Sequence, residues 1–191
     1  MSDTLFSCGV YDARELTAAD IPRMQRFFDR NPGYFRTISG ATATANEGHD
    51  DFHALPPSEW PQGRKWVIGF EVEDELCGLA TLIPDLFAAG IWHVGLFMVA
   101  ESRFGTGGPL YRSLEAWMQR HGARFLRLGV VLGNDRAVRF WRREGYRETR
   151  RRDGFVVGQQ SNVLLVMAKP LDGGTLDEYL SMVPRDRPGA P

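Results

Sequence analysis

The sequence has little cysteine and no long apolar run. Its two cysteines, Cys8 and Cys77, stand in neither a C-x-x-C pair nor another metal-ligand spacing. A disulfide-stapled scaffold is therefore not indicated, and a reducing cytoplasm is the expected location. The N-terminus has neither a basic start nor a long apolar stretch, so we expect no secretory signal and no membrane span.

An excess of charge of one sign is lacking as well. The formal net charge is −1, so the overall charge favours neither nucleic acid nor an anionic membrane as a partner. The composition that remains, 43% hydrophobic and 25% charged over 191 residues, suits one globular domain with a substantial core. We expect this domain over residues 1–170, and a tail over 171–191, where prolines and glycines recur.

The most informative stretch covers residues 91–146. An apolar run over 91–99 predicts a strand, and a loop with three glycines follows it: Gly105, Gly107 and Gly108. Glycines let backbone N–H groups converge on one point, and the helix after the loop adds the positive end of its dipole. The loop is therefore a predicted anion-binding cradle.

The helix after this loop is specified by its periodicity. Its apolar residues share one face: Leu110, Leu114, Trp117 and Met118. A strand over 125–131 and a second, short helix follow, for which Asn134 is the predicted N-cap. Upstream, 65–72 and 76–83 are predicted to form a hairpin. The order indicates a mixed α/β domain with an antiparallel front half and a β-α-β unit behind it.

The residues S-R-F-G-T-G at 102–107, followed by a helix, a strand and N-x-x-A-x-x-F-W-x-x-x-G-Y at 134–146, resemble the acetyl-coenzyme A core of the GNAT superfamily of N-acetyltransferases. The resemblance implies a single-domain mixed sheet whose two central strands splay apart. It also implies that an acetyl group passes from acetyl-coenzyme A to an amine of a small molecule or protein, directly within a ternary complex. A homodimer is expected only by analogy with the family.

The resemblance also implies which residues bind the cofactor. In the family this loop reads Q/R-x-x-G-x-G/A, and its backbone amides hold the pyrophosphate. The matching residues come from the strand, the loop and the two helices: Phe97, Met98, Val99, Arg103, Phe104, Gly105, Thr106, Gly107, Gly108, Leu110, Asn134 and Phe140. A backbone N–H at 97–99 would meet the thioester carbonyl. Ser102 replaces the first motif residue, which a cradle of backbone donors should tolerate.

A second departure from the family concerns the leaving thiolate. Many members protonate it with a tyrosine, where this chain has Trp141. An indole N–H donates a hydrogen bond but is not an acid near neutral pH. The proton would then come from Tyr111, Tyr146 or water, and the sequence does not choose among them. The alternative of a non-catalytic acyl-coenzyme A sensor or interaction module therefore stays open, as does transfer of a longer acyl chain.

Two residues are candidates for the base that takes the proton of the acceptor ammonium group. His93 stands on the strand before the glycine loop, and Glu71 stands on the predicted hairpin. The competing interpretation makes both of them ordinary polar residues that face solvent. Eight arginines between 136 and 152 include candidates for the cofactor's 3′-phosphate, but most are expected to form a solvated face.

Residues 34–63 lack periodicity and predict a long loop that has room for one helical turn. Tyr34 and Phe35, with other aromatic residues of this segment, are candidates for the wall of an acceptor pocket, or for a satellite core beneath the loop. Nearby histidines and aspartates, His49, Asp50, Asp51 and His53, match no common ligand spacing, so no metal is expected. The sequence also contains no G-K-S/T triplet for a nucleoside triphosphate.

Overall fold

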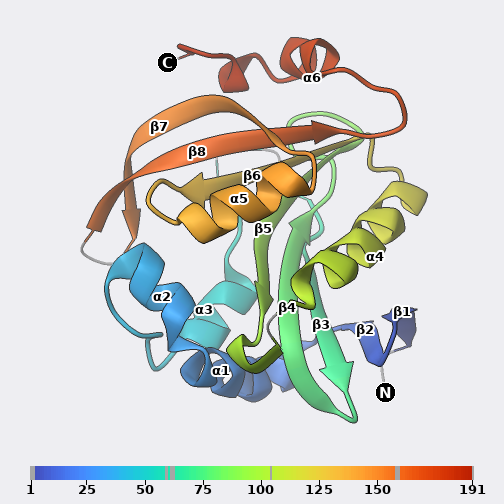
Figure 1. Cartoon of the computed structure of the whole chain (residues 1–191), viewed down its shortest axis with the longest axis vertical. Coiled ribbons are helices and arrows are strands. Elements are labelled where there is room, and N and C mark those ends of the chain that lie inside the picture. The colour runs from blue at the N-terminus through green and yellow to red at the C-terminus, as the bar shows by residue number, and fades with distance from the viewer. Residues whose placement is uncertain (1–2, 59, 61–62, 104, 158–159, 191) are drawn as a thin grey trace.

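The computed structural model describes residues 3–190 apart from 59, 61–62, 104 and 158–159 (Figure 1). Its strands form one open sheet in the order β1-β2-β3-β4-β5-β6-β8-β7. Their bounds are β1 Thr4–Cys8, β2 Tyr11–Glu15, β3 Trp66–Val72, β4 Glu75–Ile83, β5 Ile91–Val99, β6 Phe125–Val131, β7 Arg147–Val157 and β8 Gln160–Pro170. The β5–β6 pair is parallel and the other pairs are antiparallel. The predicted mixed α/β class is confirmed.

The hairpin of β3 and β4 follows from its turn. Val72 pairs with Glu75, so Glu73 and Asp74 form a two-residue loop, with φ of 49° and 64°. Positive φ at both central residues gives the turn a twist that matches the twist of the flanking strands. The predicted hairpin is therefore confirmed.

Helices cover both faces of the sheet. On the front face, which is toward the viewer in Figure 1, lie α4 (Gly107–Arg120) and α5 (Asp135–Arg143). Their apolar residues share a cluster with Trp92 and Val94 of β5. On the back face α1 (Ile21–Arg30) and α2 (Pro32–Ser39) share a second cluster with Leu96 and Met98 of β5. Side chains alternate between the two faces along a strand, so the cluster that a strand residue or its alternate neighbours join shows which face it points to.

The segment after α1 differs from its prediction as a long loop. Pro32 begins α2 at a position where its missing N–H costs nothing, and α3 covers Glu47–His53. The side chain of Lys65 donates hydrogen bonds to the carbonyls of Asp51, Phe52 and Ala54 at the end of α3. These tertiary partners stabilise a short helix that its own periodicity does not reveal.

The C-terminal segment packs on the back face. Helix α6 (Leu176–Met182) and a 3₁₀ turn at Pro184–Asp186 follow β8. Tyr179 and Val183 are fully buried in a cluster with Phe125 of β6. The predicted boundary at residue 170 stays a prediction, but part of the expected tail contributes to the core. None of the helices in the described ranges has the length and apolar character that crossing a bilayer requires.

Candidate active site

The central strands β5 and β6 pair over only half of their length. The parallel register runs from Ile91 with Phe125 to Val94 with Leu128, and it stops there. Beyond that point β5 stays paired with β4, and β6 stays paired with β8. β5 and β6 therefore diverge toward their C-terminal ends, which opens a V-shaped split in the sheet. The predicted splay of the two central strands is confirmed.

Two exposed glycines lie where the split begins. Gly95 is the extra residue of a bulge in β5, between the pairs of Val94 and Leu96 with β4, and Gly129 follows the last residue of β6 that pairs with β5. A Cβ at Gly95 would lie 2.9 Å from Oγ1 of Thr81, and a Cβ at Gly129 would lie 2.9 Å from the side chain of Leu164. The glycines therefore expose main chain at the apex of the split, where a larger residue would collide with its neighbours.

The glycine loop lies at the open end of the split. Gly105 has φ of +92°, and no atom lies within 4 Å of the position that its Cβ would take. A Cβ on Gly107 would meet only Phe140 at 3.7 Å and Val99 at 4.0 Å. Because the amides of the first turn of a helix have no intrahelical acceptor, α4 presents donors here beside open space. At Gly105 and Gly107, therefore, no side chain of their own stands between an anion and those donors.

Other residues of the predicted cradle have structural partners. The hydroxyl of Thr106 donates to the carbonyl of Arg103 at 2.8 Å, which closes the turn before α4. Gly108 lies beside the ion pair of Arg112 and Glu144, which joins α4 to the end of α5. Leu110 is buried in the front cluster. The prediction for Phe104 lies outside the described residues.

Aromatic rings line the front of the split. The ring of Phe97, on the part of β5 that β6 has left, is stacked with Phe140 at 5.9 Å, and it meets Tyr111 and Trp141 edge-on at 5.5 and 5.9 Å. Behind them the hydroxyls of Tyr111 and Tyr146 are 2.6 Å apart. Burial raises the pKa of both phenols, with the neighbouring hydroxyl and Glu115 adding to the effect at Tyr111. Both phenols are therefore neutral at physiological pH.

The second helix of the motif is capped as predicted. The side chain of Asn134 accepts a hydrogen bond from the amide of Ala137 at 3.1 Å. The cap fixes the start of α5, and α5 in turn places Phe140 and Trp141 against Phe97. Met98 instead faces back, in the cluster of α1 and α2.

His93 lies on the back face, one residue pair before the apex. Its Nδ1 is 3.4 Å from Nη1 of Arg127, the residue that it pairs with on β6. Burial and the charge of Arg127 lower the pKa of His93 to about 3, so the imidazole is neutral at physiological pH. The lowered pKa also makes the imidazole a weak proton acceptor, and its Nδ1 already faces a cationic donor.

Arg127 is itself part of a buried ion pair that joins β6 to the C-terminal segment. It donates to both carboxylate oxygens of Asp186, at 2.6 and 3.1 Å, and the hydroxyl of Tyr179 donates to the same carboxylate at 2.5 Å. The side chains of Arg127 and Asp186 are 4% and 1% exposed. Burial opposes the ionisation of Asp186, but the hydrogen bonds and charge of Arg127 prevail and lower its pKa. Neither Arg127 nor Asp186 was singled out by the sequence.

Glu71 stands apart from the split. It lies on the back face of β3, with β4 between it and β5. Arg14 donates to its Oε2 at 2.8 Å, and Arg23 forms an ion pair with its Oε1 at 2.9 Å. Asp20 joins the same two arginines, so Glu71 belongs to a closed charged cluster between β2, β3 and α1. Its predicted role as a base stays a prediction.

Tyr34 and Phe35 lie on α2, against the back of the part of β5 that no longer pairs with β6. Phe35 is buried and Tyr34 half-buried, in the cluster that includes Leu96 and Met98. Burial raises the pKa of Tyr34, and Asp51 and Glu47 on α3 add to this. At the other end of α2, Asn162 of β8 donates to the carbonyl of Ile38 at 3.3 Å. Helix α2 therefore extends behind the split from β5 to β8.

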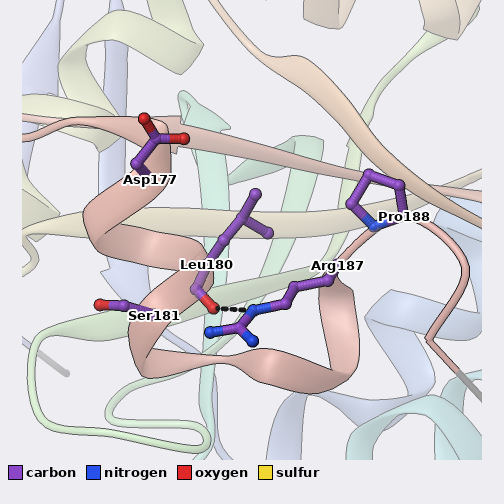
Figure 2. Close-up of a pocket in the computed structure, with 5 residues that line it drawn as sticks. All are labelled: Asp177, Leu180, Ser181, Arg187 and Pro188. Carbon is purple, nitrogen blue, oxygen red and sulfur yellow. Dashed lines mark hydrogen bonds between the residues drawn. The ribbon is translucent and has the colours of Figure 1, made fainter.

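Two hollows lie away from the apex. One, of about 410 Å³, is bordered by α6 and the residues after it, where Arg187 donates to the carbonyl of Leu180 (Figure 2). The other, of about 370 Å³, is lined by three arginines of α1 and reaches Ser102 before the glycine loop. In the described part of the chain, no group of three or more histidine, cysteine or acidic residues could hold a metal ion. The split therefore remains the place where glycines, aromatic rings and titratable groups meet.

Known proteins resemble the chain in sequence pattern and fold. The pattern of the acetyltransferase (GNAT) family matches residues 26–146. An acetyltransferase from Thermus thermophilus has a TM-score of 0.68 and 21% identity, over 88% of this chain and 100% of that one. A GCN5-related N-acetyltransferase from Kribbella flavida has a TM-score of 0.62 and 23% identity, over 85% of this chain and 99% of that one. A ribosomal-protein-alanine N-acetyltransferase from Brucella melitensis has a TM-score of 0.61 and 18% identity, over 83% of this chain and 99% of that one. At these identities the structures indicate the fold alone. No curated protein sequence matches the chain.

Proposed function

The chain belongs to the acetyltransferase (GNAT) family, and from this premise we propose that it transfers the acetyl group of acetyl-coenzyme A to an amine. The acceptor would be a small molecule or a protein, and transfer would be direct within a ternary complex. One observation carries the proposal: β5 and β6 part after Val94 and Leu128, and the open glycine loop lies at the end of the split. That arrangement offers main-chain donors to a diphosphate and an opening for an acylated thiol.

The cofactor would supply a thioester, whose carbonyl carbon is open to attack by an amine. The main chain of Gly105, Thr106, Gly107 and Gly108 would hold its diphosphate, since the positions that a Cβ would take at Gly105 and Gly107 are open. A backbone N–H at 97–99 would polarise the carbonyl, because this edge of β5 has no strand beside it. Phe97 and Phe140 would exclude water from the front of the site.

Acetyl transfer to an amine involves two proton transfers, one from the acceptor ammonium group and one to the leaving thiolate. By position His93 is the candidate base nearer to the split, because it lies one residue pair before the apex. Glu71 is separated from the split by β4, and two arginines already pair with it. On the leaving side, the Trp141 indole N–H would stabilise the thiolate as a hydrogen-bond donor without giving up its proton. Burial raises the pKa of both Tyr111 and Tyr146, which makes them poor acids, so solvent would supply the proton.

Binding of the cofactor tests the proposal directly. Acetyl-coenzyme A at about 100 times its dissociation constant should stabilise the folded state by about 2.7 kcal/mol, or a rise of about 5–10 °C in melting temperature. Gly107→Glu should abolish that rise, because it places a carboxylate where the diphosphate would lie. Thermal unfolding with and without the cofactor measures both.

Two controls separate loss of binding from loss of fold. Gly107→Ala adds a Cβ that meets its neighbours at ordinary contact distances, so the fold should tolerate it. Arg120→Glu adds a negative charge at the exposed far end of the same helix and should keep the full rise. No rise in the wild-type protein would contradict the proposal. A rise without transfer to any amine of a broad panel would favour the non-catalytic sensor.

The setting of the protein stays an expectation. Both cysteines are free thiols, which agrees with a reducing cytoplasm. A homodimer stays a prediction by analogy, and neither nucleic acid nor a membrane is expected as a partner.

A further inference from the structure

Arginines gather on the back face beside the split. Directly opposite residues of neighbouring strands share a face, and Arg150 and Arg152 of β7 pair with Val166 and Leu164 of β8. Val166 pairs in turn with Gly129 at the apex. Arg150 and the apex glycine therefore stand in one row across the sheet, about 10 Å apart by two strand spacings.

The C-terminal segment adds Arg185 to this group. Nη1 of Arg150 donates to the carbonyl of Arg185, which places the two residues in contact. The guanidinium of Arg185 lies 4.3 Å from the ring centre of Trp60 and 4.8 Å from that of Phe87. Arg127 approaches the same Phe87 ring at 5.4 Å. Four arginines from three parts of the chain thus surround one region of the back face.

Negative charge in this region is scarce. The carboxylate oxygens of Asp186 are engaged by Arg127 and Tyr179. In the described part of the chain, no carboxylate comes within salt-bridge distance of Arg152 or Arg185. Burial lowers the pKa of Arg185, and the charges of Arg127, Arg152 and Arg150 lower it further against the opposing charge of Asp186. Half-buried like charges of this kind are relieved by an anion.

We propose that Arg150, Arg152 and Arg185 bind an oxyanion carried by the acceptor, so that the amine to be acetylated also bears a carboxylate or a phosphate. This inference rests on the proposed acetyl transfer, because only that reaction makes the bound ligand an acceptor. Guanidinium groups match both oxyanions, because their planar fork donates two parallel hydrogen bonds. The cofactor is the less suitable occupant, since the helices that form its predicted cradle cover the front face.

Matched acceptors test the inference. Phenylalanine against 2-phenylethylamine isolates a carboxylate, and O-phosphoethanolamine against ethanolamine isolates a phosphate. With acetyl-coenzyme A present, the release of free thiol gives kcat and KM for each. We expect the member that carries the oxyanion in at least one pair to be preferred about 10- to 100-fold in kcat/KM, the range of a charged hydrogen bond. The pair that shows the preference identifies the oxyanion.

Variants then assign the preference to residues. Arg185→Gln and Arg152→Gln should each raise KM for the acceptor that carries the oxyanion about tenfold or more, with KM for acetyl-coenzyme A unchanged. Arg151→Gln is the matched control, because Arg151 pairs with Leu165 and faces front, where it bonds to Glu148. Arg152 lies on a strand rather than beside buried Asp186, so its variant keeps the test valid if Arg185→Gln fails to fold.

A second readout separates this inference from the proposed function. The members with and without the oxyanion are added without acetyl-coenzyme A, and the melting temperature is measured. Stabilisation of the wild type by a member with the oxyanion, lost in Arg152→Gln, would support the oxyanion site even if the cofactor did not bind. Equal treatment of amines with and without the oxyanion in both assays, or an equal loss in Arg151→Gln, would overturn the inference.

Discussion

The two faces of the sheet differ sharply where β5 and β6 part. The front is closed by neutral rings, with Phe97, Phe140 and Trp141 in mutual contact. The back holds charge, with the Arg127–Asp186 pair below the apex and Arg185 beside it. On the front, main-chain donors and rings can serve a cofactor that the whole family would share. On the back, individual charged side chains can distinguish one acceptor from another.

The largest effect should come from breaking the charged side. Arg127→Met leaves the carboxylate of Asp186 buried without its cation, which should cost about 3–5 kcal/mol in the free energy of unfolding. Denaturation by urea measures this cost. Arg124→Met is the matched control, because its ion pair with Glu178 is exposed and should be worth less than about 1 kcal/mol. Equal losses of unfolding free energy in the two variants would contradict the prediction that the buried ion pair contributes more than the exposed one.

Lowering the pH sharpens the same comparison. Because the pKa of His93 is lowered to about 3 in the folded state, the unfolded chain binds its proton first as the pH falls below about 6.5. This contribution to stability is therefore present above pH 6.5 and is lost as the pH falls toward 3. Without the charge of Arg127, the pKa of His93 should lie higher. Arg127→Met should then lose less stability than the wild type over this pH range.

More of the front of the site than of the back could be predicted from the sequence. The glycine loop, the stripe of α4 and the Asn134 cap are local signals, and the structure has those elements at the predicted positions. Arg127 stands in an otherwise apolar strand, and its partner Asp186 is 59 residues away in a segment predicted as a tail. Likewise α3 is stabilised by Lys65, the residue just before β3, rather than by an apolar periodicity of its own. Pairings between distant residues have no local signature, so the charged side could not be predicted.

A smaller effect is expected from the paired phenols behind the front rings. Tyr111→Phe leaves the buried hydroxyl of Tyr146 without its partner, which should cost about 1–3 kcal/mol in the free energy of unfolding. Adding Tyr146→Phe removes the unpaired group as well, so the double variant should be more stable than the sum of the single losses predicts. Urea denaturation of the three variants measures this coupling. Additive losses would contradict a direct bond between the two hydroxyls.

The smallest effect, and the one that tests the chemistry of the front, is expected at Trp141. Trp141→Phe keeps a ring against Phe97 but removes the N–H, so kcat should fall about tenfold, equivalent to about 1.4 kcal/mol, while KM for acetyl-coenzyme A stays the same. Trp141→Tyr is the matched variant, because a phenol both donates a hydrogen bond and can give up its proton. It should recover kcat to at least the wild-type value. Full activity in Trp141→Phe would mean that the thiolate leaves without help from this side chain, and that the rings serve only to exclude water.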